Sequence, residues 1–272
     1  MRYVRIITTV IFLCVCAAFG VTQCIALQKD NIPPVIMSDT EELHVEAVWD
    51  EAVLKQGLMA IDDRDGDLTN EIMIGNISRF LSKGVCNVEY VVFDSSNNSA
   101  VFERKVCFDN YSSPRLKLSQ PLMYYISGNV TISDRLTVWD MLDGDINNKL
   151  KIVSSNIDTT LEGTYELEVE ATNGYGDTIH ENLPVNIVYK NTDAPVIELE
   201  TYLVYAKVAE TLDPLQYIDK VRDRSGRELG VESVNVISYV DFTVPGCGQY
   251  KLEVTDAEGR QGMTYLTVIV TE

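Results

Sequence analysis

The sequence contains very little histidine and far fewer basic than acidic residues. His44 and His180 are its two histidines, and neither lies in a zinc-binding or nucleophile–base motif. This absence predicts that the chain is not an enzyme and holds no cofactor. Lys and Arg number 22 against 41 Asp and Glu, which gives a formal net charge of −19. A field of that sign repels nucleic acid, so nucleic-acid partners are excluded.

Long amphipathic-helix patterns are also lacking, and apolar residues instead recur with period two. Residues 165–171 alternate apolar side chains with glutamates, and 85–93 form a similar run that ends at the turn-forming residues 94–99. Residues 251–254 repeat the alternation. Such runs predict β-strands with one buried and one wetted face, so an all-β fold is expected.

The strand pattern is repeated three times along the chain. The repeats begin at Pro34, Pro114 and Pro195, which are spaced 80 and 81 residues apart. Later in each repeat a glycine, Gly84, Gly163 or Gly248, stands shortly before an alternating run. A fixed period with matching punctuation indicates a tandem array. Turn signals every 8–12 residues predict about seven short strands per repeat, folded as a sandwich of two antiparallel sheets. The expected domains are residues 32–112, 114–190 and 194–272.

The N-terminal segment differs from the rest. Residues 1–5 carry Arg2 and Arg5, and residues 6–27 carry no charge. That length suffices to span a bilayer, and the two arginines would hold the N-terminus in the cytoplasm. A cleaved signal peptide, or lipidation of Cys24, are the alternatives. All three place the remaining chain outside the cytoplasm, either anchored in the cell membrane with its C-terminus out or secreted. Because the chain ends at Glu272 directly after a strand, the N-terminal segment is the expected anchor.

The repeats resemble the bacterial immunoglobulin-like domains that occur in tandem on surface proteins and in an insecticidal crystal toxin. The resemblance rests on Pro-Val-Ile, on Asp-x-x-Asp-Gly-Asp and on a late Gly-x-Tyr strand, and it covers about 240 residues. The second repeat fits well, the first has Cys86 in place of the tyrosine, and the third lacks the acidic turn. The resemblance implies three tandem immunoglobulin-like β-sandwiches after an N-terminal apolar helix, used as an extracellular spacer or adhesion module.

Two acidic turns are the dense carboxylate clusters of the sequence. Calcium is bound by six to eight oxygen ligands, which makes these aspartates candidate ligands. The alternative is ordinary turn chemistry, in which Asp accepts backbone hydrogen bonds and Gly supplies a positive φ. The third repeat has Ser225-Gly226-Arg227 at this place, which favours the structural interpretation. The candidate calcium ligands are Asp62, Asp65, Asp67, Asp140, Asp143 and Asp145.

Three cysteines lie in the exported part. Cys86 and Cys107 are placed symmetrically about a hairpin loop that is centred between Ser96 and Asn97. This symmetry predicts that the two cysteines lie opposite each other, with their Cα atoms within disulfide range. The same register puts Glu103 and Lys105 opposite expected core residues, so two free thiols remain the alternative. Cys247 has no evident partner in its repeat.

Two functions fit these observations. The first is a non-catalytic, membrane-anchored spacer or adhesion protein whose partner is a surface protein or glycan. Its third domain carries the most basic patch of the exported part, formed by Arg222, Arg224 and Arg227. The second is a carbohydrate-binding protein of the cell surface, for which the candidate aromatic residues are Trp139, Tyr124, Tyr125, Tyr202 and Tyr205.

Overall fold

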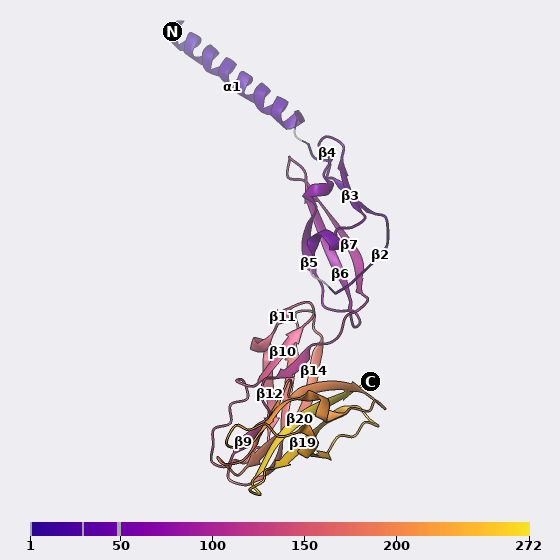
Figure 1. The fold of residues 1–272 in the computed structure, drawn as a ribbon. Helices are drawn as coiled ribbons and strands as arrows, with labels where there is room; N and C mark the ends of the chain where they lie inside the picture. The colour runs from indigo at the N-terminus through magenta and orange to yellow at the C-terminus, as the bar shows by residue number, and fades with distance from the viewer. Residues whose placement is uncertain (1, 29, 48–49) are drawn as a thin grey trace. The chain divides into compact units, whose positions relative to one another are not determined.

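The computed structural model describes residues 2–28, 30–47 and 50–272. Helix α1 (Arg2–Gln28) is followed by strand-rich domains, and the chain divides into two compact units, Met1–Asp109 and Asn110–Glu272 (Figure 1). Within α1, Ile6–Gln23 is long and apolar enough to cross a membrane, and none of it is buried. The side chains of Arg2, Arg5 and Cys24 lie outside the described part of the chain.

The first unit contains one β-sandwich after the helix. Three strands form one sheet in the order β1-β3-β4 and four form the other in the order β2-β7-β6-β5. The strands are β1 (Val35–Ser38), β2 (Glu42–Val45), β3 (Leu58–Asp62), β4 (Gly66–Asp67), β5 (Met73–Ile77), β6 (Val85–Phe93) and β7 (Ser99–Phe108). Short helices α2 (Glu51–Leu54) and η1 (Thr69–Glu71) connect them.

The second unit contains two further sandwiches, the second and third domains. In the second domain, β11-β10-β8 face the sheet β12-β13-β14-β9; in the third, β15-β17 face β16-β20-β19-β18. The second domain has β8 (Arg115–Leu118), β9 (Met123–Tyr125), β10 (Leu136–Asp140), β11 (Gly144–Asp145), η2 (Asn147–Lys149), β12 (Leu150–Ser155), β13 (Gly163–Thr172) and β14 (Thr178–Val188). The third has β15 (Val196–Leu199), β16 (Leu203–Lys207), η3 (Pro214–Tyr217), β17 (Ile218–Arg222), η4 (Val231–Ser233), β18 (Val234–Ser238), β19 (Gly246–Thr255) and β20 (Gln261–Thr271).

All three domains share one departure from the expected antiparallel pairing. Strands β2, β9 and β16 each pair in parallel with the last strand of their domain, while the other pairs are antiparallel. The period-two pattern is otherwise followed: in β6, residues Cys86, Val88, Tyr90 and Val92 are fully buried and alternate with partly exposed neighbours. The tandem β-sandwich fold expected from the sequence is therefore confirmed.

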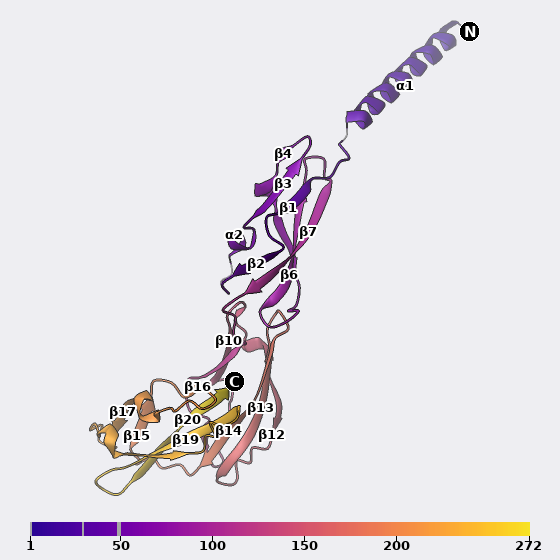
Figure 2. The same cartoon turned by 90° about the vertical axis from the view of Figure 1, so that its right-hand side faces the viewer.

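The last strand of the third domain breaks this alternation. Residues 264–270 of β20 are buried without interruption. Leu266 and Val268 face the core of their own domain, whereas Ile269 joins the core of the second domain. Strand β14 lies beside β19, as both views show (Figures 1 and 2). The second and third domains are thus joined through the outer faces of their sheets as well as by their linker.

Candidate functional site: a groove between the second and third domains

The contact between these two domains has a polar centre. Asn186 of β14 and Gln249 of β19, both buried, exchange two amide hydrogen bonds: Asn186 Nδ2 donates to Gln249 Oε1 at 2.8 Å, and Gln249 Nε2 donates to Asn186 Oδ1 at 3.2 Å. The Thr164 hydroxyl also donates to Asn186 Oδ1 at 2.8 Å. Buried amides are costly unless paired, so this reciprocal pair fixes the register of one sheet face against the other.

A tyrosine forms a second link across the contact. The backbone N–H of Leu116, in the second domain, donates to the hydroxyl of Tyr205 in β16 at 2.8 Å. The guanidinium of Arg115 lies 4.8 Å from the centroid of the Tyr205 ring. Burial raises the pKa of Tyr205 to about 12, so its hydroxyl stays neutral at physiological pH. Together with the buried side chains of Leu203 and Ile269, these contacts hold the two domains as one body.

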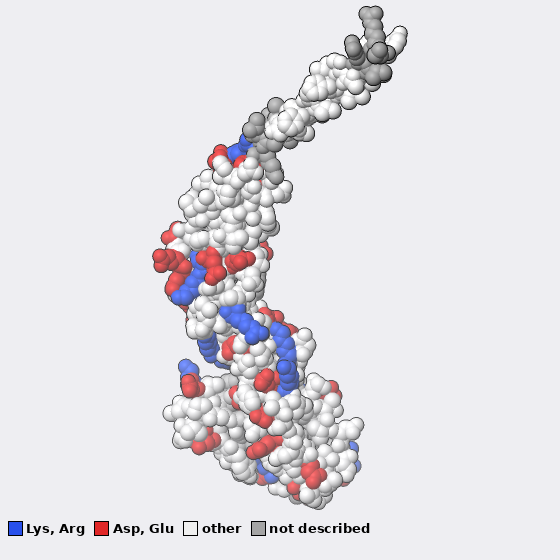
Figure 3. Space-filling model, turned by 180° about the vertical axis from the view of Figure 1, so that it is seen from behind, with Lys and Arg blue, Asp and Glu red and all other residues white. Residues whose placement is uncertain are grey.

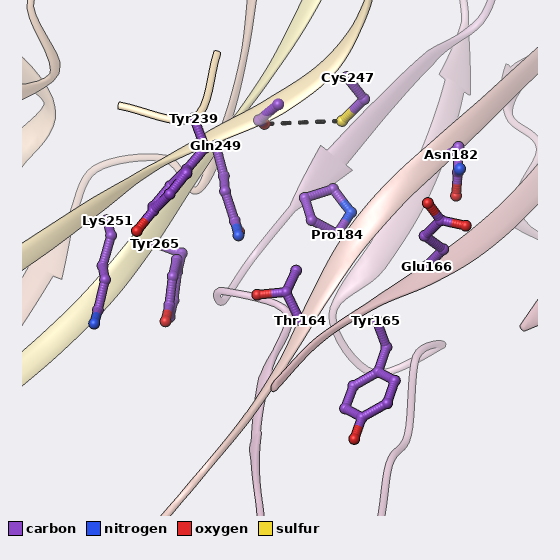
Figure 4. Close-up of a pocket in the computed structure, with 11 residues that line it drawn as sticks. Thr164, Tyr165, Glu166, Asn182, Pro184, Tyr239, Cys247, Gln249, Lys251 and Tyr265 are labelled. Carbon is purple, nitrogen blue, oxygen red and sulfur yellow. Dashed lines mark hydrogen bonds between the residues drawn. The ribbon is translucent and has the colours of Figure 1, made fainter. Parts of the chain in front are cut away.

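Beside the Asn186–Gln249 pair, the two sheet faces are separated by a groove. Its volume is about 480 Å³. One wall comes from β13 and β14 and the other from β19, β20 and the segment after β18 (Figure 4). The residues that line it are Thr164, Tyr165, Glu166, Asn182, Pro184, Tyr239, Cys247, Gly248, Gln249, Lys251 and Tyr265.

The groove combines aromatic and polar surface. Tyr239 is 60% exposed, and Tyr265, at 7%, lies much deeper. Glu166 and Asn182 stand on the opposite wall from Lys251 (Figure 4). The ammonium of Lys251 pairs with Glu253 at 2.7 Å, a hydrogen bond that raises the pKa of Lys251. Aromatic faces flanked by amide and charged groups suit an extended polar ligand with some apolar surface.

Catalytic groups are sparse in this groove. Its lining residues, all of them described, include one carboxylate, Glu166, and no histidine. Burial raises the pKa of the Cys247 thiol far above its usual range, so this cysteine is protonated and a poor nucleophile. The neighbouring Glu168 is held by the Ser154 hydroxyl and by His180, and these hydrogen bonds lower its pKa. Glu168 therefore does not supply the carboxyl of raised pKa that a glycosidase pair needs, and Glu181, whose pKa is raised by burial, does not line the groove.

The acidic turns form through local hydrogen bonds. Asp62 Oδ1 accepts from the N–H groups of Arg64 and Asp65, both at 2.9 Å, and Asp140 Oδ1 accepts in the same way from Leu142 and Asp143. Gly66 and Gly144 complete the turns with φ of 79° and 72°. In the third domain, Asp223 and Gly226, with φ of 84°, make a related turn.

The six predicted calcium ligands are not brought together as two clusters. Asp65 binds the N–H and hydroxyl of Ser95, and Asp67 accepts from the N–H of Thr69. Asp143 binds Lys149 and the N–H of Gly174, and Asp145 binds Asn147. Among the described residues, only Asp62 of the six has a carboxylate oxygen close to two other potential ligands, and those are Asp30 and Asp94.

The predicted Cys86–Cys107 disulfide is wrong, because both thiols are free. In the β6–β7 hairpin, Cys86 lies opposite Val106 and Cys107 opposite Val85, one residue away from the expected register. A one-residue shift turns side chains to opposite faces of a sheet. Cys86 is accordingly fully buried, whereas Cys107 is partly exposed on the other face. The same shift resolves the conflict over Glu103 and Lys105, because Arg104 now points into the core.

The predicted arginine patch is largely engaged in ion pairs. Arg227 Nε donates to Asp223 Oδ2 at 3.0 Å, and Arg224 lies 3.0 Å from Asp193. The backbone of Arg222 pairs with that of Glu228 in an isolated antiparallel β-bridge. On the face shown in Figure 3, basic and acidic side chains are interspersed on both units. The patch therefore offers little uncompensated positive charge.

The aromatic residues proposed for sugar binding lie elsewhere. Tyr124 is 4% exposed in the core of the second domain, and Tyr205 is committed to the domain contact. Trp139 is exposed but has Lys117 over its ring, 5.5 Å from the centroid. Tyr125 and Tyr202 line a different hollow, beside the linker between the two domains. The groove tyrosines were missed because their meeting depends on the packing of two domains.

Comparison with known proteins gives one curated relative by sequence. The chain is 28% identical over 221 residues to the pesticidal crystal protein Cry22Aa of Bacillus thuringiensis. The match covers 78% of this chain and 29% of that protein, so the chain spans less than a third of its relative. A scan against protein-family models finds no match.

Solved structures similar to this chain are modular proteins. Drosophila N-cadherin EC1-3 matches with 13% identity and a TM-score of 0.32, covering 90% of this chain and 91% of that one. A Clostridium perfringens protein with an M60 catalytic domain and two CBM51 domains matches with 14% identity and a TM-score of 0.25, covering 89% and 31%. TM-scores this low do not establish a common arrangement of domains. Function is therefore inferred from this chain's own residues.

Proposed function

We propose that this protein is a non-catalytic adhesion protein of the cell surface that binds its partner in the groove between the second and third domains. The observation that carries the proposal is the fixed contact around Asn186 and Gln249, which preorganises both walls of the groove. Because the walls of the groove need no rearrangement, little binding free energy is lost in ordering side chains when a ligand binds. The sparse catalytic groups in the groove support a binding role.

A glycan is the ligand class that the groove favours. Tyr239 offers an exposed ring for stacking, and Asn182 and Glu166 offer hydrogen-bonding groups on the facing wall. Sugar rings present apolar C–H faces and peripheral hydroxyls, which match this combination. A protein segment is the alternative partner.

A glycan array separates the two ligand classes. The full chain, held in lipid nanodiscs without glycosidic detergent, should bind a restricted set of glycans. Tyr239→Ala should weaken that binding at least tenfold, about the effect of losing one aromatic hot-spot contact. Phe93→Ala removes an exposed aromatic side chain of the first domain as a control and should leave binding unchanged. Silence across the array would reject the glycan and leave a protein partner.

We also propose that α1 anchors the protein in the membrane and that the sandwiches are displayed outside the cytoplasm. The uncharged apolar stretch of α1 supports this, and so does the exposure of all its described side chains, which no other described part of the chain covers. N-terminal sequencing of the mature protein tests the anchor. A chain that retains its N-terminal segment and stays with membranes in alkaline carbonate is expected. Recovery of a soluble chain starting near residue 27 would reject the anchor in favour of a signal peptide.

A further inference from the structure

Three carboxylates meet at one end of the first domain. Asp30 precedes β1, Asp62 ends β3, and Asp94 follows β6. Their residues are 7%, 4% and 6% exposed, and one carboxylate oxygen from each lies within 4.8 Å of the others. Three negative charges at this separation, removed from water, repel each other strongly unless a cation joins them.

The hydrogen bonds of these carboxylates leave two oxygens unused. Each Oδ1 accepts from backbone N–H groups: Asp30 from Ile32, Asp62 from Arg64 and Asp65, and Asp94 from Ser96 and Asn98. Asn98 Nδ2 donates to Asp94 Oδ2 at 2.6 Å. The Oδ2 atoms of Asp30 and Asp62 are buried and have no hydrogen-bond partner.

The positive charge near this cluster is limited. Arg64 Nε lies 3.9 Å from Asp30 Oδ2 and forms an ion pair with it. That arginine side chain is 53% exposed. Solvent screening makes such a pair weak, so it does not compensate three buried carboxylates.

The other two domains show how the same positions are compensated there. In the third domain, Asp223 and Asp256 each bind an arginine four residues later, Arg227 at 3.0 Å and Arg260 at 2.7 Å. Four residues after Asp62 and Asp94, the first domain instead has Gly66 and Asn98, and neither carries a positive charge.

The second domain uses neutral partners instead. Asn173 occupies the place of Asp94, and its Nδ2 donates to Asp140 Oδ2 at 3.1 Å. The Tyr111 hydroxyl lies 3.2 Å from the same oxygen and 2.9 Å from Asp177 Oδ2. Among the described residues, the first domain therefore brings three carboxylates together with two of their buried oxygens lacking a hydrogen-bond donor.

We propose that Asp30, Asp62 and Asp94 bind a divalent cation, with calcium as the preferred ion. The ligands are all oxygens, which suit a hard cation and disfavour zinc. The carbonyl oxygens of Asp30 and Ile32, which accept hydrogen bonds of 3.3 and 3.4 Å from Asn98, are further oxygen ligands nearby. Magnesium keeps several waters and needs strict octahedral geometry, whereas calcium accepts a cage of carboxylates and carbonyls.

The ion has a structural consequence for the start of the first domain. Asp30 lies two residues after the end of α1, whereas Asp62 and Asp94 belong to the β3–β4 turn and the β6–β7 hairpin. A bound cation therefore ties the segment that follows α1 to two turns of the sandwich. This inference does not depend on the groove or on its ligand.

Titration calorimetry tests the proposal. The full chain is held in neutral detergent micelles, stripped of metal with a chelator, and titrated with calcium. One calcium per chain is expected. Saturating calcium should raise the melting temperature of the first domain by about 5 °C or more, because the ion binds only the folded site. Magnesium should bind at least tenfold more weakly. Absence of calcium binding, or equal binding of magnesium, would overturn the proposal.

Three variants locate the ion. Asp62→Asn and Asp94→Asn should each weaken calcium binding at least tenfold and remove the shift in melting temperature. Asp94→Asn introduces the residue that the second domain has in this place, so it is expected to fold even if Asp62→Asn does not. Asp67→Asn alters an exposed acid of the same turn and should leave binding within about twofold. Unchanged binding in Asp94→Asn, or equal loss in Asp67→Asn, would overturn the assignment.

Discussion

Asn186 and Gln249 form a buried, reciprocal pair of amide hydrogen bonds, at 2.8 and 3.2 Å, across the contact between the second and third domains. Their side chains project from the outer faces of two different sheets. In a single sandwich these faces would be exposed to water. The pair is one of the contacts that join these two domains in one compact unit.

Removing both members of this pair should cost less stability than the sum of the two single removals. Gln249→Ala leaves the Asn186 amide buried with its donor unpaired, and a loss of about 1–3 kcal/mol in the free energy of unfolding is expected. The double variant Asn186→Leu/Gln249→Leu removes both polar groups and should lose less than the sum of the single leucine variants. Urea denaturation of the full chain measures both. Additive single effects would show that the amides are not coupled.

Arg104 should be essential to the first domain. Its side chain is 2% exposed, and its guanidinium donates to the carbonyl oxygens of Leu54 at 2.7 Å and Gln56 at 2.8 Å and lies over the Tyr90 ring. Arg104→Ala removes the hydrogen bonds to both carbonyls, of which Leu54 keeps the one from the Tyr90 hydroxyl, and leaves a cavity, with an expected loss of about 3 kcal/mol or more. Arg104→Lys should also destabilise, since an ammonium cannot reproduce the planar fork.

The adjacent Lys105 supplies a matched control. It points to the exposed face and pairs with Glu42 at 2.6 Å. Lys105→Ala should change the free energy of unfolding by less than about 1 kcal/mol, as for other exposed ion pairs. Equal destabilisation by the alanine variants at 104 and 105 would contradict the observed strand register.

The register of this hairpin also shows what the sequence could and could not predict. Alternation along residues 85–93 and the repeat itself predicted the strands and the tandem sandwiches. Whether Cys86 faces Val106 or Cys107 depends on a one-residue shift that the alternation of one strand does not fix, and that shift decided the disulfide.

The groove shows a different limit of sequence-based prediction. Residues 263–270 of β20 are an almost continuous apolar run, which is typical of a strand buried on both faces. That signal indicates a covering partner but does not say which surface covers the strand. Tyr165 and Tyr239 are far apart in sequence, and only the docking of two domains brings them to one groove. Of the Asp30–Asp62–Asp94 cluster, the sequence predicted Asp62 alone as a ligand, because Asp30 and Asp94 lie about 30 residues away in the chain and outside the acidic turn.

Cys86, Cys107 and Cys247 should differ in their reaction with iodoacetamide. Burial raises the pKa of the Cys86 thiol to about 11, so it is protonated at pH 8 and shielded from reagent. Cys107 is partly exposed and should be alkylated first, without any reductant. Cys247 should react only after unfolding. Mass spectrometry of tryptic peptides measures the order, and a peptide linked through Cys86 and Cys107 would contradict the free thiols.

His44 should titrate above its ordinary pKa. Its Nδ1 lies 2.8 Å from Asp109 Oδ1, and this hydrogen bond, with the charges of Asp109 and Glu42, raises the pKa of His44. A raised folded-state pKa means that the protonated histidine contributes stability below about pH 6.5, and that this contribution is lost as the pH rises through the raised value. NMR titration of the imidazole protons should show the shift. Asp109→Asn should lower the pKa toward the ordinary value, and an unchanged pKa would argue against the pair.

The central claim is that the groove between the second and third domains holds the adhesion partner. Co-sedimentation of the full chain, in nanodiscs, with cell envelopes of the source organism tests it most directly. The wild-type protein and Phe93→Ala should sediment equally, whereas Tyr239→Ala should require at least about tenfold more envelope for the same bound fraction. Equal sedimentation of Tyr239→Ala and wild type, or no sedimentation of the wild type, would contradict the claim.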